Sequence, residues 1–138
     1  MQYTTLGLTG LKVSVAGLGS GGFSRLGLGT GHSEDDAIAL VREAHAQGIT
    51  LFDTGNNYNT EAVLGRALEP IARDRIVITS KTPMHRAAGT RPPEEVIAGL
   101  DASLRDLKTD YLDVFMLHGV PPVHYPYARD VIIPAMLR

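Results

Sequence analysis

The sequence contains no cysteine, no long apolar run and no strong excess of charge of either sign. Without cysteine, the chain cannot form disulfide bonds, thiolate metal sites or a thiol nucleophile. A formal net charge of −2 argues against nucleic acid or an anionic membrane surface as a partner. The apolar runs are too short to cross a bilayer, and the first residues lack the features of a signal peptide. We therefore expect a soluble cytoplasmic protein.

The length and composition indicate one globular unit in which strands and helices alternate. Of the 138 residues, 43% are hydrophobic and 20% are charged, which is typical of a chain with a buried core. A hairpin is expected at residues 2–15, and strands are expected to start near residues 14, 49, 75 and 111 with a helix in each gap. Connections of this length require a parallel sheet, so the expected fold class is α/β.

Several helix boundaries carry a local signal. Ser33 precedes three acidic residues and is a candidate N-cap, and Gly48 fits the position just past the helix end. Thr60 is a candidate cap for a helix from residue 61 to about 71. Further helices are expected at residues 94–107 and 130–138, whereas residues 19–31 and 82–93 are expected to be loops.

The glycine-rich stretch at residues 17–22, GLGSGG, matches the G-x-G-x-x-G pattern of dinucleotide-binding folds. That fingerprint requires a helix to open at the third glycine and an acid about 20 residues later. Neither is present, since the helix signal begins only at Ser33 and Asp53 lies farther along the chain. Two other interpretations stay open: a mobile loop, or a loop on a barrel rim where glycine lets a ligand approach the backbone.

Three of the expected strands end in polar side chains, Asp53, Lys81 and His118. Each residue alone is typical of a solvated strand end. Together they lie on one face, because the carboxyl ends of parallel strands meet there, and in α/β barrels that face carries the active site. Tyr58 follows Asp53 by five residues and can fold back over the same rim.

These four residue types can deliver a proton to a carbonyl oxygen while a hydride adds to the carbon. A phenol with an ordinary pKa of about 10 is a weak acid at neutral pH, and a neighbouring lysine ammonium lowers that pKa. A carboxylate would hold the ammonium in place, and a histidine opposite could orient the carbonyl by donating a hydrogen bond. Metal binding by His118, His124 and Asp53 is the competing interpretation, but HxH and HExxH spacings are absent, so no metal is expected.

Several motifs resemble the aldo-keto reductase family. They are LFDTGNNY at residues 51–58 followed by EAVLGRAL, RIVITSKT at 75–82, and SLRDLKTDYLDVFMLHG at 103–119. The expected hairpin is similar to the plug of that family's barrel. Gly55 and Asn59 depart from the usual Ala and Gly, which leaves the spacing of the four residues intact and affects the shape of the loop. Residues 117–137 most resemble the branch that includes sugar and pyridoxal dehydrogenases.

The resemblance implies a (β/α)8 TIM barrel and NAD(P)H-dependent interconversion of a carbonyl (aldehyde, ketone or sugar) and an alcohol. By matching position it implies that Asp53, Tyr58, Lys81 and His118 are the catalytic tetrad, with a small-molecule carbonyl or alcohol as substrate. It also implies that Gly21, Gly22 and Phe23 lie beside the nicotinamide of NADP(H) or NAD(H), and that Asp53 contacts the nicotinamide ribose.

A complete barrel of this kind has roughly 250 residues. The chain supplies the hairpin and about four β-α units, which is the N-terminal half. We therefore expect residues 1–138 to be a single partial domain, a truncated and inactive fragment of a longer reductase. The alternative is a non-catalytic half-barrel module that self-associates or pairs with a partner chain through its exposed edges.

Overall fold

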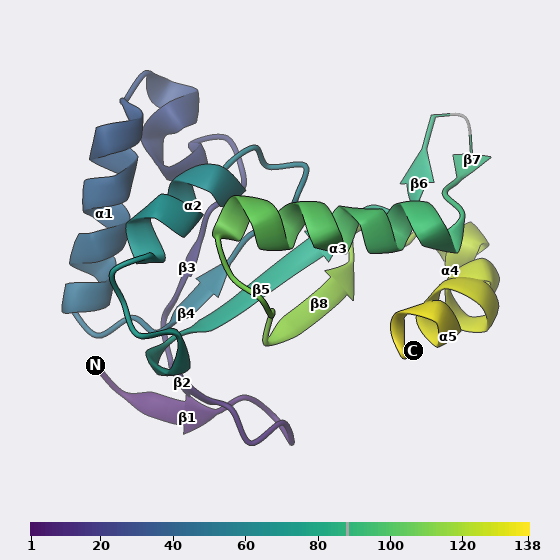
Figure 1. Ribbon diagram of the computed structural model, residues 1–138, viewed down its shortest axis with the longest axis horizontal. Helices are drawn as coiled ribbons and strands as arrows, with labels where there is room; N and C mark the ends of the chain where they lie inside the picture. The colour runs from purple at the N-terminus through teal and green to yellow at the C-terminus, as the bar shows by residue number, and fades with distance from the viewer. Residues whose placement is uncertain (88) are drawn as a thin grey trace.

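The computed structural model describes residues 1–87 and 89–138, and its centre is a parallel sheet of four strands. The strands lie in chain order, β3-β4-β5-β8 (Figure 1). Their bounds are β3 (Gly17–Gly19), β4 (Leu51–Asp53), β5 (Val77–Thr82) and β8 (Val114–Leu117). All three pairings are parallel, so the expected α/β class is confirmed.

Three helices connect successive strands: α1 (Glu34–Ala46), α2 (Glu61–Leu68) and α3 (Pro93–Leu107). They pack next to one another along one face of the sheet, α1 against α2 and α2 against α3 (Figure 1). The close approach of α2 to α3 depends on Gly65, because a Cβ at that position would lie 2.4 Å from the carbonyl oxygen of Asp106. A single layer of helices outside a parallel sheet is the arrangement of one side of a barrel.

The local signals for α1 are confirmed, and α2 begins at Glu61 with Thr60 at its N-cap position as predicted, but without a capping hydrogen bond from the side chain. Ser33 accepts a hydrogen bond from the backbone N–H of Asp36, whose carboxylate accepts from the backbone N–H of Ser33, so a capping box opens α1. The Thr60 side chain does not cap α2. Its hydroxyl is fully buried and bonds instead to the hydroxyls of Ser20, at 2.9 Å, and Thr54, at 3.4 Å.

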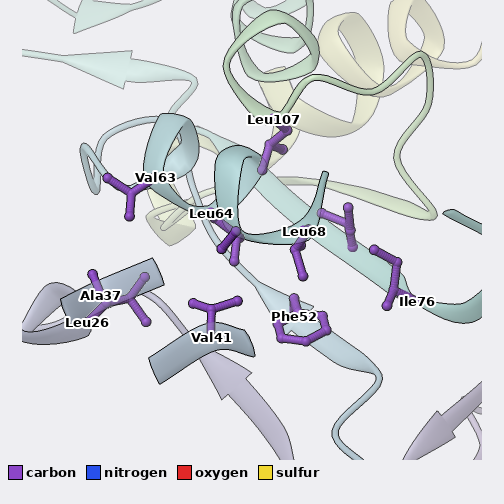
Figure 2. Packing of buried hydrophobic residues seen from close by; sticks show 11 residues of the cluster. Leu26, Ala37, Val41, Phe52, Val63, Leu64, Leu68, Ile76 and Leu107 are labelled. Carbon is purple, nitrogen blue, oxygen red and sulfur yellow. The ribbon is translucent and has the colours of Figure 1, made fainter. Parts of the chain in front are cut away.

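The main hydrophobic core lies between the sheet and helices α1 and α2 (Figure 2). Phe52 of β4 is fully buried and belongs to the same cluster as Val41 of α1 and Leu64 of α2. Fully burying one such side chain is worth roughly 1.5–3 kcal/mol. The other buried members are Leu26, Ala37, Val63, Ala67, Leu68, Ile76, Ile78 and Leu107. This packing fixes the position of Asp53, the residue directly after Phe52.

The expected N-terminal hairpin is confirmed as β1 (Tyr3–Thr5) paired antiparallel with β2 (Lys12–Ser14). It lies near the amino-terminal ends of the parallel strands (Figure 1). The Tyr3 hydroxyl donates to the carbonyl oxygen of Gly48 at 3.1 Å, and Ser14 and Thr50 exchange two hydrogen bonds of 2.9 Å. The hairpin is therefore attached at the end of the sheet opposite to the rim that carries Asp53 and Lys81.

Segments expected to be loops contain short regular elements. Residues 19–31 include the 3-10 helix η1 (Arg25–Thr30), which is interrupted by left-handed residues and held by the buried Leu26. Residues 82–93 include β6 (His85–Arg86) paired with β7 (Gly89–Thr90). Two further 3-10 turns are η2 (Arg73–Arg75) and η3 (Pro122–His124). Elements this short carry no apolar periodicity, which is why the sequence pattern does not reveal them.

The last helical segment begins before residue 130, earlier than expected. It consists of α4 (Tyr125–Tyr127), the π-helical η4 (Ala128–Ile132) and α5 (Ile133–Met136). Ala128 and Ile132 are buried with Met84 and Val96 in a second, smaller core. Met84 follows β5 and Val96 belongs to α3, so this second core joins the C-terminal helical segment to both.

The two outer strands of the sheet, β3 and β8, each pair with only one strand within the ranges that the structure describes. All four residues of β8 are half-buried rather than buried. No helix in residues 1–87 or 89–138 has the length and apolar character needed to cross a membrane.

Candidate active site

The carboxyl ends of β4, β5 and β8 bring three of the predicted site residues to one rim. Asp53 is the last residue of β4, Lys81 is the penultimate residue of β5, and His118 directly follows β8. Backbone hydrogen bonds continue the sheet beyond these ends: the N–H of Asn56 donates to the carbonyl of Lys81, and that of His118 donates to the carbonyl of Thr82. The rim is therefore held by the same kind of backbone hydrogen bonds between strands as the sheet.

Asp53 and Lys81 form an ion pair on this rim. The Lys81 Nζ lies 2.7 Å from each carboxylate oxygen of Asp53 and 2.6 Å from the carbonyl oxygen of Thr54. The Thr79 hydroxyl donates to Asp53 Oδ1 at 2.7 Å. An ammonium has three N–H donors, and three oxygens surround this one. The lysine side chain is 16% exposed and the carboxylate 40% exposed, so the pair borders solvent on the Asp53 side.

Tyr58 folds back over the rim, as its spacing from Asp53 predicts. Its backbone N–H donates to the carbonyl of Gly55 at 2.9 Å, which closes a turn. The Lys81 Nζ lies 5.0 Å from the centroid of the Tyr58 ring. A Cβ at Gly21 would lie 2.6 Å from the same ring, so the glycine makes room for the tyrosine. The half-buried ring is thus fixed by the ammonium on one side and by the backbone at Gly21.

His118 completes the cluster. Its Nε2 lies 3.4 Å from the Tyr58 hydroxyl oxygen, and the two rings meet edge to face with centroids 5.3 Å apart. Its Nδ1 lies 3.0 Å from the Oδ1 of Asn57. The structure therefore brings Asp53, Tyr58, Lys81 and His118 together in one chain of contacts.

Two polar residues of this cluster, Asn57 and Thr79, are absent from the sequence-based prediction. Asn57 stands directly before Tyr58, but nothing in the order of residues indicates that its side chain reaches His118 across 61 positions. Thr79 lies two residues before Lys81 in β5, and period-2 alternation places both side chains on the same face of the sheet. That alternation is the signal that could have identified Thr79.

The residues predicted to contact a cofactor do not all lie in the cluster around Tyr58. Gly21 lies against Tyr58, and Gly22 adopts a φ of 75°, which favours glycine. Apart from the two chain neighbours of each glycine, no heavy atom of the described residues lies within 4 Å of the Cβ position at Gly22 or at Gly19, the strand partner of Asp53. Phe23, by contrast, is 85% exposed and does not join the cluster. The open space at the backbone of Gly19 therefore lies beside Asp53 on the neighbouring strand.

A buried acid lies behind the rim. Glu61, at the start of α2, is 3% exposed and accepts hydrogen bonds from Ser80 Oγ at 2.6 Å and Ser103 Oγ at 3.1 Å. Burial raises the pKa of the Glu61 carboxyl above its ordinary value, although the two serine hydrogen bonds act in the opposite direction. Because Ser80 precedes Lys81, Glu61 connects α2 and α3 to the strand that carries the lysine.

The residues named in the competing metal interpretation do not converge. His124 stacks on His85 with ring centroids 6.2 Å apart, whereas His118 faces Tyr58 and Asn57. Within the described parts of the chain, no group of three or more histidine, cysteine, aspartate or glutamate side chains has the arrangement of a metal site.

Comparison with known proteins is consistent across sequence and structure. The model of the aldo/keto reductase family matches residues 17–136. Among curated proteins, L-galactose dehydrogenase of Arabidopsis thaliana is 36% identical over 126 residues, aldo-keto reductase YhdN of Bacillus subtilis 33% over 135, and the NADH-specific methylglyoxal reductase of Escherichia coli 30% over 153. These alignments cover 87%, 89% and 96% of the chain. The chain spans 39%, 39% and 47% of the relatives' own lengths, respectively.

Solved structures give the same result. The holo form of an aldo-keto reductase from Bacillus halodurans superposes with a TM-score of 0.78 at 31% identity, covering 98% of the chain and 45% of that protein. A thermostable aldo-keto reductase bound to the inhibitor epalrestat has a TM-score of 0.78 at 26% identity, covering 99% and 48%. The described sheet and helices therefore correspond to part of the barrel in those structures.

Proposed function

Because the chain belongs to the aldo/keto reductase family, we propose that its rim is the proton-transfer half of a site that interconverts a carbonyl compound and an alcohol with NAD(P)(H). The observation that supports this proposal is the continuous set of contacts from Asp53 through Lys81 to Tyr58 and His118. The names of two relatives, a sugar dehydrogenase and a methylglyoxal reductase, are in line with aldehyde, ketone or sugar substrates.

Tyr58 is the proposed general acid and base. Its hydroxyl can give a proton and, as a phenolate, take one back, and the Lys81 side chain near its ring is ion-paired with Asp53. The ammonium near the ring stabilises the phenolate that remains when the proton leaves. In the reduction, the hydroxyl proton goes to the carbonyl oxygen as a hydride adds to the carbon. In the oxidation, the phenolate takes the proton of the alcohol.

The open backbone beside Asp53 fits the nicotinamide end of the cofactor. Gly19 and Gly22 leave space where a Cβ would point, and Asp53 keeps solvent-facing lone pairs that can accept from a ribose hydroxyl. A reduced nicotinamide, when bound, supplies the hydride. Gly21, Gly22 and Asp53 are the residues proposed to line this end. Phe23, which is exposed, is proposed to close on the cofactor from the solvent side.

Turnover by residues 1–138 alone is not expected. The chain spans less than half of the relatives' own lengths, and β3 and β8 have one unpaired edge each within the described residues. We propose that a second barrel half is required to complete the site.

A non-catalytic module is the second candidate, and a specific surface supports it. Beside the open edge of β8 lies an apolar groove of 540 Å³ between α3, β8 and the C-terminal helical segment, with Leu100, Phe115 and Met136 among its lining. An open strand edge next to an apolar groove is a site for pairing with another chain. Light scattering on eluted size-exclusion fractions distinguishes a defined dimer, which supports the module, from a monomer.

The enzymatic proposal is tested with a chimera. Residues 1–138 are joined to the C-terminal part of the Bacillus halodurans reductase, and NADPH and NADH oxidation is followed with a panel of aldehydes and sugars. Tyr58→Phe is expected to reduce the rate by about 100-fold or more, the usual contribution of a general acid. The control is Tyr111→Phe, at an exposed tyrosine outside the rim. An active chimera that keeps its rate after Tyr58→Phe would refute the assignment.

A further inference from the structure

The carboxylate of Asp53 is contacted by two side chains of the neighbouring strand. In the parallel pairing of β4 with β5, Asp53 is opposite Thr79, and Lys81 follows two residues later in β5. Side chains two residues apart in a strand lie on the same face of the sheet. Thr79 and Lys81 therefore approach the carboxylate together. Ser80, between them, faces the helices and donates to Glu61.

The Thr79 hydroxyl is the donor in its contact with Asp53. Its Oγ1 lies 2.7 Å from Oδ1 of the carboxylate. That carboxylate is ion-paired with Lys81, and an ionised carboxylate can only accept hydrogen bonds. Thr79 is 6% exposed, which limits competition from water for its hydroxyl proton. The direction of this hydrogen bond thus follows from the chemistry of the two groups.

We propose that Thr79 is a positioning residue that fixes the rotation of the Asp53 carboxylate about its Cβ–Cγ bond. That torsion is broad in aspartate and has no single preferred value. The Lys81 ammonium cannot fix it alone, because it lies at the end of a flexible four-carbon stem and can follow the carboxylate. Threonine is β-branched and its χ1 is restricted, so its hydroxyl is the stiffer of the two contacts. The threonine therefore sets the orientation to which the ammonium adjusts.

This orientation decides which carboxylate oxygen is open to a ligand. Oδ1 accepts from both Thr79 and Lys81, whereas within the described residues Oδ2 accepts from Lys81 alone. Each oxygen has two lone pairs, so the unfilled acceptor position is on Oδ2 of a carboxylate that is 40% exposed. A ligand hydroxyl would donate there. That this ligand is the cofactor ribose rests on the proposed function, whereas the positioning by Thr79 does not.

The test is 15N NMR of the lysine ammonium groups of the 138-residue chain, which has three lysines. Lys81→Met identifies the Lys81 signal, and its proton exchange with water is measured. Thr79→Val removes the hydroxyl and keeps the branched shape. It should accelerate exchange at Lys81 about tenfold, because a hydrogen bond to a charged group is lost and the carboxylate can turn away. Thr79→Ser should restore slow exchange. Thr79→Ala gives the same comparison if the valine variant does not fold.

Thr82 provides the matched control. It is a buried threonine of the same strand, and its hydroxyl contacts the Asn56 side chain at 2.9 Å rather than Asp53. Thr82→Val should leave exchange at Lys81 unchanged. An equal acceleration in Thr82→Val and Thr79→Val would show a general loosening of β5 and overturn the proposal. So would an unchanged exchange rate in Thr79→Val, or a failure of Thr79→Ser to restore it.

The chimera separates the positioning from the proposed function. There, Thr79→Val is expected to raise the KM for the nicotinamide cofactor about tenfold, and Thr79→Ser to return it. If exchange at Lys81 responds as expected while the chimera lacks reductase activity, only the proposed function fails. If the chimera is active and its KM does not change, the link between Oδ2 and the cofactor is refuted.

Discussion

The ammonium of Lys81 is held between both carboxylate oxygens of Asp53, at 2.7 Å from each, across the pairing of β4 with β5. Asp53 is opposite Thr79 in the register, two residues before Lys81, so the lysine side chain reaches back along its strand to meet the carboxylate. The ion pair thus connects two neighbouring strands at the level where Tyr58 folds over the rim.

Removing the lysine is expected to destabilise the chain. Lys81→Met should lower the free energy of unfolding by about 1–3 kcal/mol, between the values for exposed and buried pairs, because Lys81 is mostly buried and Asp53 is not. Urea denaturation of Lys81→Met, Asp53→Ala and the double variant measures the coupling. The exposed pair Lys108–Glu69 is the control, and Lys108→Met should cost less than about 1 kcal/mol. Strict additivity of the two site substitutions would show that the pair contributes nothing.

Gly21→Ala is expected to displace Tyr58. The new methyl group would lie 2.6 Å from the ring, and overpacking of this kind costs about 1–3 kcal/mol. Nuclear Overhauser effects between the Tyr58 and His118 rings should weaken or disappear. Gly19→Ala is the matched control, because among the described residues only its chain neighbours can lie within 4 Å of its Cβ position, and those effects should persist. Unchanged ring contacts in Gly21→Ala would contradict the fixed position of the tyrosine.

Glu61 is expected to make stability depend on pH. Burial raises its pKa in the folded chain above the unfolded value of about 4.3, so the folded state holds the proton more tightly. The contribution of Glu61 is then fully present below pH ~4.3 and decreases as the pH rises through the folded pKa. Glu61→Gln should make the free energy of unfolding depend less on pH in this range, since glutamine cannot ionise.

The measurement is urea denaturation at several pH values above 4, and the exposed Glu43 provides the control. Glu43→Gln is expected to leave the profile unchanged. If the free energy of unfolding changes with pH as steeply in Glu61→Gln as in the unsubstituted chain, the buried carboxyl does not cause the pH dependence.

Arg73 is expected to anchor the start of β8. Its guanidinium donates to the Asp113 carboxylate at 2.7 Å and to the carbonyls of Ile76 and Tyr111, and it stacks over the Tyr111 ring at 3.9 Å. Asp113 also accepts from the backbone N–H of Ile78. Arg73→Met leaves a mostly buried carboxylate without its cation, so the free energy of unfolding should fall by about 2–4 kcal/mol.

Thermal unfolding of Arg73→Met and of Arg75→Met gives the comparison. Arg75 is exposed two residues later, and its substitution should change the midpoint little. Equal shifts in the two variants would contradict the anchoring role of Arg73.

Local signals in the chain were enough to predict the order of the elements and the rim. Ser33 and its acids specify the start of α1 through short-range hydrogen bonds and charge. The alternation of apolar strands with helices requires parallel pairing, and parallel pairing brings the carboxyl ends together. Asp53, Lys81 and His118 could therefore be assigned to one rim without any coordinates.

Other features depend on contacts between segments far apart in the chain, and only the folded structure reveals these contacts. Thr60 is of a residue type that commonly caps helices. Its hydroxyl is buried away from solvent and is hydrogen-bonded to that of Ser20, 40 positions away. Asn57 reaches His118 across 61 positions, and Gly65 is required by the backbone of α3. No local pattern encodes which distant atom a side chain will meet, since that distance is set by how the sheet and helices pack. The arrangement of strands at the rim thus follows from the residue pattern, while the contact of Asn57 with His118 follows from tertiary packing.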